Sequence, residues 1–451
     1  MKHVSQLSKL GLFDARVPRY TSYPTAPQFG AGLTGETFAD WIARIEPNSQ
    51  ISLYLHVPFC RRLCWFCACR TQGTSSDAPV IAYAQTLKEE LEMLRRALPE
   101  GVELSRLHWG GGTPTMLPPD EMRAIAALVF DIAPLAKDGE FSVEIDPNEI
   151  DDARLDALAE AGMNRASIGV QDFDGEIQAV IGRDQSFEIT KTAVDAIRAR
   201  GISSLNADIL YGLPHQTPKR IADSVQKLLT LNPDRVALYG YAHVPWMARR
   251  QQMIPSDTLP RPEKRLDLFD TARRLFMWDG YDEIGIDHFA RSHDGMAKAA
   301  KAGTLRRNFQ GYTDDQSPVL IGLGASSISR FPQGYAQNAP ATANWKKAVQ
   351  AGEFATVRGH AFTSEDLWRG RAIEALMCDF RVSARELTES YGAPQAAVEA
   401  LFAATCAKFG EFVAREGDAL VIPQAGRPLT RMIATAFDAY AMEKAGHSSA
   451  V

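Results

Sequence analysis

The sequence predicts an α/β protein built on a partial (β/α)6 barrel, with an N-terminal arm before it and a mainly helical domain after it. From about residue 51, short apolar or β-branched runs alternate with longer segments of helical period, as in repeated βα units around a mainly parallel sheet. At least six such units follow one another, and each strand ends in polar or glycine-rich residues. Because barrel enzymes place their chemistry at those strand ends, a barrel is favoured over a dinucleotide-binding sheet.

The individual elements follow from hydrophobic periodicity. Strands are expected at 51–57, 105–110, 141–146, 165–170, 204–211, 235–242 and 282–289. The segment 79–98 has Ile81, Ala84, Leu87 and Leu91 at intervals of three or four residues, so it is expected to form a helix with one apolar face. Similar faces, opening near Pro, Asp or Ser, predict helices at 119–133, 153–162, 186–201 and 221–232.

Three regions are expected along the chain. Residues 1–35 contain "VPRYTSYPTAPQF", a proline-rich and aromatic stretch that predicts an ordered arm over the active site. Residues 36–355 form the barrel with its extension, and residues 356–451 form the C-terminal domain. In the latter, helices are expected at 364–380, 383–392, 394–410 and 428–445, with a hairpin at 411–422, an arrangement of winged-helix type.

Composition narrows the class of protein. Six cysteines in 451 residues are too few for a secreted disulfide scaffold, and the first twenty residues lack the apolar segment of a signal peptide. We therefore expect reduced thiols and a cytoplasmic protein. No apolar run is long enough to cross a bilayer, so no membrane insertion is expected. The net charge of -6 argues against a nucleic-acid surface.

Four of the six cysteines lie within ten positions, at Cys60, Cys64, Cys67 and Cys69. Zinc sites typically use two separated ligand pairs, and the short step from Cys67 to Cys69 strains a closed four-thiolate shell. A disulfide is disfavoured in a reducing compartment. The third interpretation is an iron–sulfur cluster held by three thiolates on the loop after the first strand, which leaves one iron open to a substrate.

Other strand ends carry polar or glycine-rich residues. "HWGGGTPT" (108–115) closes the second strand, and its glycines let a ligand approach the backbone directly. Glu144, Gln171 and Asp208 end later strands. A core hydrogen bond or a helix cap is the alternative for each, but their shared position favours a ligand site, because a buried carboxylate needs a partner.

The spacing C-x3-C-x2-C after the first strand, with the aromatic Phe66 before the last cysteine, resembles the radical S-adenosylmethionine enzymes. The resemblance implies a [4Fe-4S] cluster whose open iron chelates the methionine moiety of S-adenosylmethionine, and one-electron cleavage to a 5'-deoxyadenosyl radical. Cluster potentials depend on charge, hydrogen bonds to sulfur and exposure, so a shielded site is expected.

Longer strings, including "PRYTSYPT", "HVPFCRRLCWFCAC", "LHWGGGTPT", "YGLPHQTP", "DHFAR" and "RNFQGYT", closely resemble the oxygen-independent coproporphyrinogen III oxidase family, also called coproporphyrinogen dehydrogenases, from about residue 16 to 440. The resemblance implies oxidative decarboxylation of two propionates of coproporphyrinogen III to vinyl groups, giving protoporphyrinogen IX in haem biosynthesis. It also implies two S-adenosylmethionine molecules per chain.

The resemblance further implies residue roles. Cys60, Cys64 and Cys67 hold the cluster, and Cys69 is a fourth cysteine required for activity. The first S-adenosylmethionine contacts Tyr54, Gly111, Glu144 and Ile328. The second is lined by Phe66, Gly112, Thr113, Gln171, Arg183, Asp208 and Ala242.

Four propionates need cationic partners in an acidic protein. We expect Arg19, Arg291 and Arg306 or Arg307 to supply some of them, and Tyr20, Tyr23, Phe309 and Gln310 to shape the macrocycle pocket. The alternative for each arginine is a surface salt bridge. A flavodoxin- or ferredoxin-like reductant is expected as partner, and a monomer is favoured because no heptad repeat is present.

Two other functions compete with this interpretation. A haem chaperone of the same superfamily resembles the chain through the barrel but typically lacks the C-x-C extension and the arm, so Cys69 and "VPRYTSYPT" favour the enzyme. A zinc-bearing scaffold protein would be colourless, whereas an iron–sulfur protein prepared without oxygen is brown.

Overall fold

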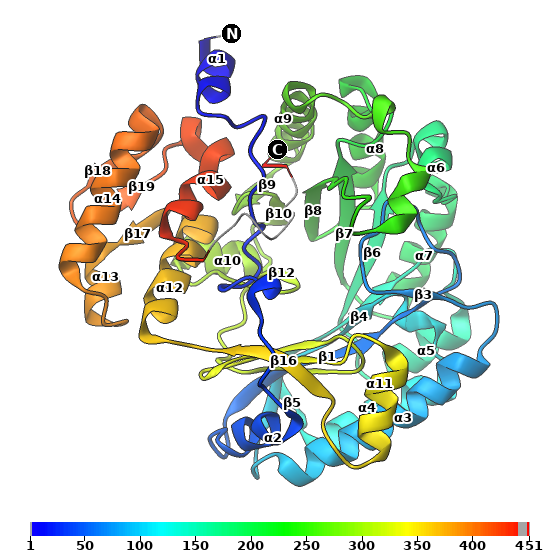
Figure 1. Ribbon diagram of the computed structural model, residues 1–451. Coiled ribbons are helices and arrows are strands. Elements are labelled where there is room, and N and C mark those ends of the chain that lie inside the picture. Colours follow the sequence, from blue (N-terminus) through cyan, green and yellow to red (C-terminus); the bar gives the residue numbers. More distant parts are fainter. Residues whose placement is uncertain (1, 441–448, 451) are drawn as a thin grey trace.

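The computed structural model describes residues 2–440 and 449–450 of the chain. Its centre is a curved twelve-stranded sheet with the order β16-β15-β14-β13-β1-β4-β5-β6-β7-β8-β10-β9 (Figure 1). Six neighbouring parallel strands form the barrel: β1 (Gln50–Val57), β4 (Glu103–Gly111), β5 (Leu135–Ile145), β6 (Arg165–Gln171), β7 (Ser204–Tyr211) and β8 (Arg235–Gly240). The predicted α/β barrel is therefore confirmed.

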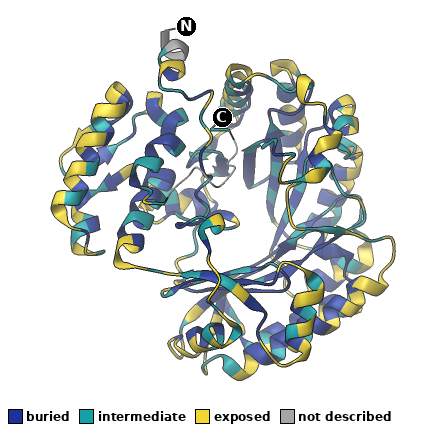
Figure 2. Ribbon diagram, in the orientation of Figure 1, coloured by how far each residue is buried: buried dark blue, intermediate teal, exposed yellow. Residues whose placement is uncertain are grey.

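Helices connect these strands and cover the outside of the barrel. They are α3 (Ala78–Ala97), α4 (Pro119–Ile132), α5 (Asp152–Glu160), α6 (Gly175–Ile181), α7 (Phe187–Ala199) and α8 (Pro218–Thr230). Figure 2 shows the buried strands inside and the exposed helix faces outside. In α3 the buried face begins at Val80 and continues through Ala84, Leu87 and Leu91, whereas Ile81 is 39% exposed, so its predicted place on the apolar face was wrong.

Shorter strands extend the sheet at both edges. On the β1 side, β13 (Leu320–Leu323) is parallel to β1, and β14 (Ile328–Phe331), β15 (Gly334–Asn338) and β16 (Thr356–Ala361) continue antiparallel. Helices α2 (Gly35–Ala43) and α11 (Thr342–Gln350) lie beneath this part (Figure 1). Helix α9 (Pro262–Trp278) packs against α8 near the other edge.

The strand expected at 282–289 was wrong in one respect, since the segment contains a turn. β9 (Tyr281–Ile284) and β10 (His288–Arg291) form an antiparallel hairpin, and β10 pairs antiparallel with β8. Gly285 between them has φ +55°, the left-handed conformation that glycine adopts without strain. The hairpin places Asp287 near the carboxyl end of β8 and Arg291 near its amino end.

The C-terminal region has the element order of a winged helix. It contains α12 (Ser364–Asp379), β17 (Arg381–Ser383), α13 (Ala384–Glu389), α14 (Gln395–Phe409), β18 (Ala414–Glu416) and β19 (Ala419–Val421). The helix expected at 428–445 was wrong in its described part: α15 spans only Thr430–Ala434, and residues 441–448 lie outside the described residues. The Asp438 side chain accepts from the backbone N–H of Tyr440 at 2.9 Å, which replaces a helical hydrogen bond.

The arm packs on the C-terminal region. Leu12, Phe13 and Val17 share a hydrophobic core with residues of α12, α14 and α15, separate from the barrel core. The remaining elements are α1 (Lys2–Lys9), β2 (Phe59–Cys60), β3 (Gln72–Gly73), α10 (Gly295–Ala302), β11 (Arg306–Asn308) and β12 (Gly311–Thr313), with several short 3-10 turns.

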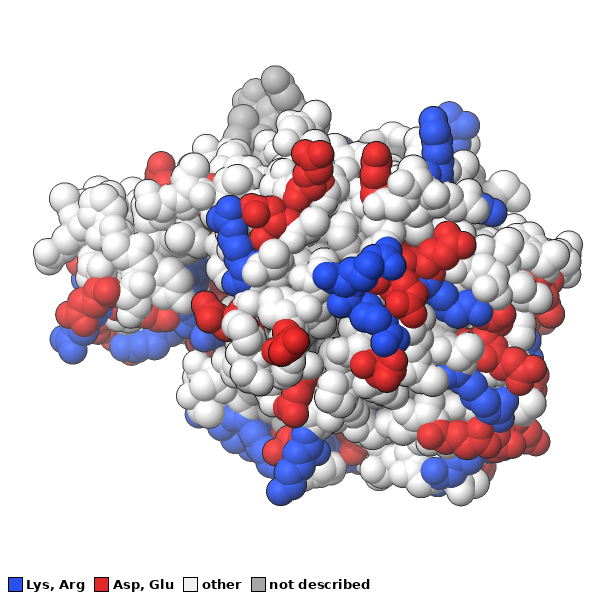
Figure 3. Space-filling model, turned by 90° about the horizontal axis from the view of Figure 1, so that it is seen from below, with Lys and Arg blue, Asp and Glu red and all other residues white. Residues whose placement is uncertain are grey.

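The surface seen from below mixes acidic and basic side chains without a large field of one sign (Figure 3). This agrees with the modest net charge of -6. Among the helices of the described residues, none combines the length and the apolar composition that crossing a membrane requires.

Candidate active site

The cysteine loop leaves the carboxyl end of β1 and is held by its neighbours. The backbone N–H of Trp65 donates to Ile181 O of α6 at 2.9 Å, and that of Thr113 donates to Phe59 O at 2.7 Å. Gly182 touches the Trp65 indole so closely that an added Cβ would lie 2.9 Å from it. These contacts fix the loop against the ends of β4 and β6.

Donors point at the thiols from two directions. Thr113 Oγ1 lies 3.7 Å from Cys60 Sγ, and Arg183 Nη1 lies 3.5 Å from Cys64 Sγ. Burial raises the pKa of Cys60 to about 11 and also raises the pKa of Cys64, against the opposing effect of Arg183. Cys67 accepts a hydrogen bond from the Cys69 thiol, which lowers the pKa of Cys67 to about 6.

These residues fit an iron–sulfur cluster. The thiolate ligands of such a cluster carry negative charge. Hydrogen bonds from Thr113, from Arg183 and from the backbone N–H of Cys69, which lies 3.4 Å from Cys67 Sγ, would stabilise that charge. Within the described residues, no three His, Cys, Asp or Glu side chains come together as ligands of a single metal ion.

The glycine run at the end of β4 forms a close backbone surface beside the cysteine loop. Gly112 N donates to Val57 O at 2.9 Å, and a Cβ on Gly112 would lie 2.5 Å from Phe59 O. Gly111 has φ +114° and donates its N–H to Glu144 Oε2 at 3.0 Å. Glycine at position 112 allows this close approach of two backbone segments. That a ligand contacts the glycine backbone stays a prediction.

The residues expected around the first S-adenosylmethionine lie on neighbouring strands. Tyr54 of β1 stacks on His108 of β4, with ring centroids 5.7 Å apart, and its hydroxyl lies 2.9 Å from His56 Nδ1. Tyr54 is also in register with Gly322 of β13, which lies beside Ile328 at the start of β14. Tyr54, Gly111 and Glu144 therefore lie on the neighbouring strands β1, β4 and β5, and Ile328 lies on β14, one strand beyond β13.

The residues expected around the second S-adenosylmethionine come from several segments. Gln171 ends β6, Asp208 lies within β7 and Ala242 follows β8, whereas Phe66 is in the cysteine loop, Gly112 and Thr113 follow β4, and Arg183 follows α6. Gln171 has φ +67°, which turns the chain at the end of β6. Arg183 Nη2 donates to Gly169 O at 2.8 Å. Burial raises the pKa of Asp208 to about 6, although a hydrogen bond from Asn206 at 3.0 Å favours the ionised form.

Gln251 is a site residue that the sequence did not reveal. Its Nε2 donates to Phe66 O at 2.7 Å and to Ala242 O at 3.0 Å, so one buried amide joins the cysteine loop to the end of β8. Arg250 Nη2 likewise donates to Cys69 O at 3.1 Å. Both lie in a short 3-10 helix (Arg249–Met253) after β8, and the sequence of this segment gave no signal for either.

The barrel encloses a polar cavity of about 130 Å³. Its lining includes His108, Glu144, Asp208, Tyr239, His288 and Gln310. His288 Nδ1 lies 2.7 Å from Asp287 Oδ1, and Tyr239 OH lies 3.4 Å from His288 Nε2. Gln310 lines this cavity, and its role in a macrocycle pocket stays a prediction.

Two of the expected substrate arginines lie at this end of the barrel. Arg19 Nη2 donates to Gly240 O, at the end of β8, at 2.6 Å. Arg307 Nε donates to Tyr20 O at 3.2 Å, and the guanidinium carbon of Arg307 lies 4.4 Å from the centroid of the Tyr312 ring. Arg306, the alternative to Arg307, lies beside it in β11 and lines a different cavity.

Tyr20 and Tyr23 hold the arm in place. The Tyr20 hydroxyl donates to Asp438 Oδ2 at 2.9 Å, and the Tyr23 hydroxyl accepts from Ala439 N at 3.0 Å. Both rings are buried. Phe309 packs edge-on against Phe29 of the arm and against Tyr335.

Arg291 is not at this site. It forms an ion pair with Asp279 at 2.8 Å, and its N–H donates to Asp234 O before β8 begins. The cause is the hairpin in 281–291, which reverses the chain so that Arg291 lies at the opposite end of β8. Its expected role with a propionate is corrected to that of a structural ion pair.

A (β/α)6 barrel with three thiols on the loop after its first strand is the arrangement of the radical SAM class. The radical SAM superfamily model matches residues 54–228. Two curated relatives named oxygen-independent coproporphyrinogen III oxidase cover nearly the whole chain. One, from Paracoccus denitrificans, is 66% identical over 451 residues, covering 100% of both chains, and one from Escherichia coli is 37% identical over 431 residues, covering 95% of this chain and 94% of the relative.

A solved structure of Escherichia coli coproporphyrinogen III oxidase, described in its title as a radical SAM enzyme, superposes with a TM-score of 0.89. It is 34% identical to this chain, and the match covers 95% of this chain and 100% of that one. The chain belongs to the family of oxygen-independent coproporphyrinogen III oxidases.

Proposed function

We propose that this protein converts two propionates of coproporphyrinogen III to vinyl groups by oxidative decarboxylation without oxygen, giving protoporphyrinogen IX and two CO2. The observation that carries the proposal is the juxtaposition of three thiols after β1 with the glycine and carboxylate surface of Gly111 and Glu144. Full-length relatives that bear this enzyme's name support the choice of substrate.

Cys60, Cys64 and Cys67 would hold a [4Fe-4S] cluster, and Tyr54, Gly111, Glu144 and Ile328 would hold the S-adenosylmethionine bound to it. Bound there, they would supply hydrogen-atom abstraction. S-adenosylmethionine would be the net oxidant: for each propionate converted to a vinyl group and CO2, one S-adenosylmethionine would become methionine and 5'-deoxyadenosine, and the electron supplied by the cluster would return to an acceptor. An unactivated C–H beside a ring is too weak an acid for a side-chain base at neutral pH, so proton abstraction by the chain's own residues is not an alternative.

The protein's own residues bind, orient and shield. The glycine backbone and the Glu144 carboxylate present acceptors and donors at fixed positions, which orients a ligand before reaction. Phe66, Gly112, Thr113, Gln171, Arg183, Asp208 and Ala242 would line a second S-adenosylmethionine. Cys69 and Gln310 are proposed as active-site residues beside the substrate.

Arg19 and Arg307 are proposed as propionate partners, because Arg19 donates to Gly240 O at the end of β8, Arg307 donates to Arg19 O and Tyr20 O, and both line one cavity. Tyr20 and Tyr23 are proposed to act indirectly, by fixing the arm that carries Arg19. The three regions 1–35, 36–355 and 356–451 are proposed as arm, catalytic barrel with extension, and C-terminal domain, although β16 at the start of the last region pairs with β15 of the central sheet. The shared core of the arm and the C-terminal region supports their acting as one cover.

We also propose a cytoplasmic monomer that receives electrons from a flavodoxin- or ferredoxin-like carrier. All six cysteines are free thiols, which suits a reducing compartment. A low-potential cluster needs a one-electron donor, and carriers of this type supply single electrons.

The test is anaerobic reconstitution with iron, sulfide, S-adenosylmethionine, reductant and coproporphyrinogen III, followed by chromatography of the porphyrinogens. We expect protoporphyrinogen from the wild type, no cluster absorbance from Cys60→Ser, and cluster absorbance without product from Cys69→Ser. Cys406→Ser, in α14, is the matched control and should retain both the cluster absorbance and the formation of protoporphyrinogen. Stable stoichiometric haem capture without product would refute the enzyme and support a haem chaperone.

A further inference from the structure

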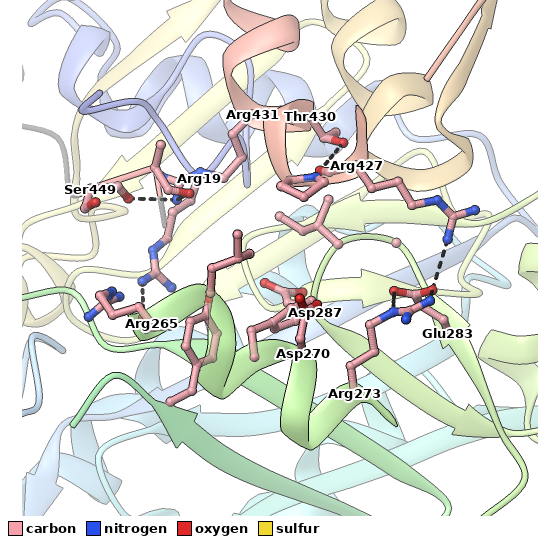
Figure 4. Close-up of a pocket in the computed structure, with 18 of the residues that line it drawn as sticks. Arg19, Arg265, Asp270, Arg273, Glu283, Asp287, Arg427, Thr430, Arg431 and Ser449 are labelled. Atoms are coloured by element: carbon pink, nitrogen blue, oxygen red, sulfur yellow. Dashed lines mark hydrogen bonds and ion pairs between the residues drawn. The ribbon is translucent and has the colours of Figure 1, made fainter. Parts of the chain in front are cut away.

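Arg307 lines both a large cavity and a smaller one. The large cavity, of about 370 Å³, lies between the end of β8, α9 and the C-terminal region (Figure 4). Acids and arginines pair within it, since Glu283 lies 2.7 Å from Arg273 and 3.0 Å from Arg427. The smaller cavity, of about 180 Å³, is formed by residues of the β11–β12 hairpin, β13 and β14, and its charges are arranged differently.

Positive charge predominates in the smaller cavity. Its charged residues, within the described part of the chain, are three arginines and one acid: Arg306, Arg307, Arg330 and Asp315. Asp315 already accepts hydrogen bonds from the hydroxyls of Ser52 and Ser105. Neither Arg306 nor Arg330 forms an ion pair or a side-chain hydrogen bond with another described residue. The cavity is therefore suited to an anion.

Two guanidinium nitrogens of this group are buried without an acceptor. Arg306 Nη1 and Arg307 Nη1 have no hydrogen-bond partner among the described residues. Burial opposes the charge of Arg307, but Tyr312 and Asp287 raise its pKa, so this arginine stays charged. Because a buried N–H without an acceptor costs free energy, a carboxylate that accepts from these donors would be stabilised.

Strand β14 directs Arg330 toward the side of the sheet where S-adenosylmethionine is proposed to bind. Successive side chains of a strand point to opposite faces. Phe331 packs on Phe38 and Trp41 of α2, with ring centroids 5.5 and 5.6 Å apart, so Arg330 and Ile328 point to the other face. Ile328 is a proposed contact of the S-adenosylmethionine on the cluster. Arg330 therefore shares its face with that site, one alternation further along the strand.

The smaller cavity also adjoins the polar cavity inside the barrel. Four residues line both cavities: Asn308, Thr313, Asp315 and Leu320. Gln310, in the same hairpin as Arg306 and Arg307, lines the barrel cavity together with Glu144. A substrate with one side chain in the barrel cavity can therefore extend another toward the arginines.

The chemistry of the proposed reaction decides which carboxylates suit these arginines. A propionate that reacts loses its charge as CO2, so a guanidinium on it would stabilise the substrate more than the transition state. A propionate that the reaction leaves intact keeps its charge throughout, and a clamp on it positions the macrocycle without opposing the chemistry. Arginines outside the barrel cavity are therefore better placed on the retained carboxylates.

We propose that Arg306 and Arg330, together with Arg307, bind carboxylates of the propionates that the reaction leaves intact. The inference rests on the proposed function and adds to it the part of the substrate that this cavity recognises. It predicts that substrate and product bind through the same contacts, since protoporphyrinogen IX retains these carboxylates.

The first test compares binding of the two porphyrinogens. Reconstituted protein with S-adenosylmethionine but without reductant is mixed anaerobically with coproporphyrinogen III or protoporphyrinogen IX. Bound and free ligand are separated by ultrafiltration and measured after oxidation to the fluorescent porphyrin. Because a charge-assisted contact is lost, Arg306→Gln and Arg330→Gln should each weaken both ligands by a similar factor of about ten or more. Weakening of coproporphyrinogen III alone, or of neither ligand, would overturn the inference.

The dimethyl ester of protoporphyrinogen IX separates a carboxylate contact from a structural effect. The ester lacks both retained charges, so the wild type should bind the free acid about tenfold or more tightly than the ester. In Arg330→Gln this preference should fall, because the variant loses affinity for the acid and not for the ester. A preference equal to that of the wild type in both arginine variants would overturn the inference, since their losses would then be structural.

Arg427→Gln is the matched control. Arg427 lines the large cavity and not the smaller one, and it pairs with Glu283, so binding of both porphyrinogens should stay unchanged. An equal loss in this variant would overturn the inference, because the loss of any nearby arginine would then suffice. Melting temperature and cluster absorbance check that each variant is folded.

Measurements on the wild type cover variants that fail to fold. Equal binding of ester and acid by the wild type would overturn the inference, while product formation would still support the proposed function. A wild type that forms no protoporphyrinogen would overturn the function and this inference together.

Discussion

Replacing Gly112 by alanine should displace the cysteine loop and impair cluster assembly. The new Cβ would lie 2.5 Å from Phe59 O and 2.9 Å from Pro58 C, whereas ordinary contact begins at 3.4 Å. Both atoms belong to the backbone that leads into Cys60, so no side chain can rotate away. The loop must move by nearly 1 Å, a displacement that costs about 100-fold in rate when it affects reacting groups.

The same overpacking should cost about 1–3 kcal/mol of folding free energy. The hydrogen bonds from Gly112 N to Val57 O and from Thr113 N to Phe59 O join the two loops, so the displacement also reaches Thr113, the donor to Cys60. We therefore expect fewer irons per chain after reconstitution, weaker cluster absorbance and a lower melting temperature than in the wild type.

Gly175→Ala is the matched control for this prediction. It makes the same chemical change at the start of α6, where an added Cβ meets nothing within 4 Å. Iron analysis, absorbance, thermal denaturation and turnover are measured on both variants. Full iron content and wild-type turnover in Gly112→Ala would refute the argument that the two backbones touch.

Three further predictions follow from particular contacts. Burial raises the pKa of Glu90 to about 7 from 4.5, so the folded state holds a proton that the unfolded state releases. The stability that this group contributes is therefore present below pH 4.5 and is lost, by about 3 kcal/mol, as the pH rises through 7. Glu90→Gln should flatten the plot of unfolding free energy against pH measured by urea denaturation. Arg183→Gln removes a cationic donor to Cys64, so redox titration should show a more negative cluster potential, and an unchanged potential would exclude that contact. Arg291→Ala breaks a pair with Asp279 far from the candidate site, so it should leave the substrate KM unchanged and lower the melting temperature slightly; a raised KM would restore Arg291 to the substrate pocket.

The strand-end motifs could be predicted because they depend on local sequence. Alternating apolar strands and amphipathic helices predict parallel strands whose carboxyl ends all lie at one edge of the sheet. Cys60, Gly111, Glu144 and Asp208 were therefore expected together at that edge. The structure places Gly111 and Glu144 at the carboxyl ends of β4 and β5 and Cys60 in β2, just after β1, whereas Asp208 lies within β7, three residues before its end. The glycines at 110–112 could also be recognised from the sequence as a site of close contact, because a backbone that touches another backbone leaves no room for a side chain.

Other features depend on contacts between distant segments. The hairpin at Gly285 reverses the chain because β10 pairs with β8, and the segment DEIGIDHF (282–289), with isoleucines at alternate positions, predicts one strand instead. The helix expected at 428–445 stops early since Asp438 bonds the backbone of Tyr440 and the hydroxyl of Tyr20, more than 400 residues away in sequence.

The sequence by itself determined the barrel, the thiol loop and the candidate ligands at the strand ends, because hydrophobic period and residue spacing are local properties. Only the tertiary structure decided that Arg306, Arg307 and Arg330 share one cavity and that Arg291 lies elsewhere. Long charged side chains have no periodic signature, and their role depends on which carbonyls, carboxylates and neighbouring cations the folded chain brings within a few ångströms of them.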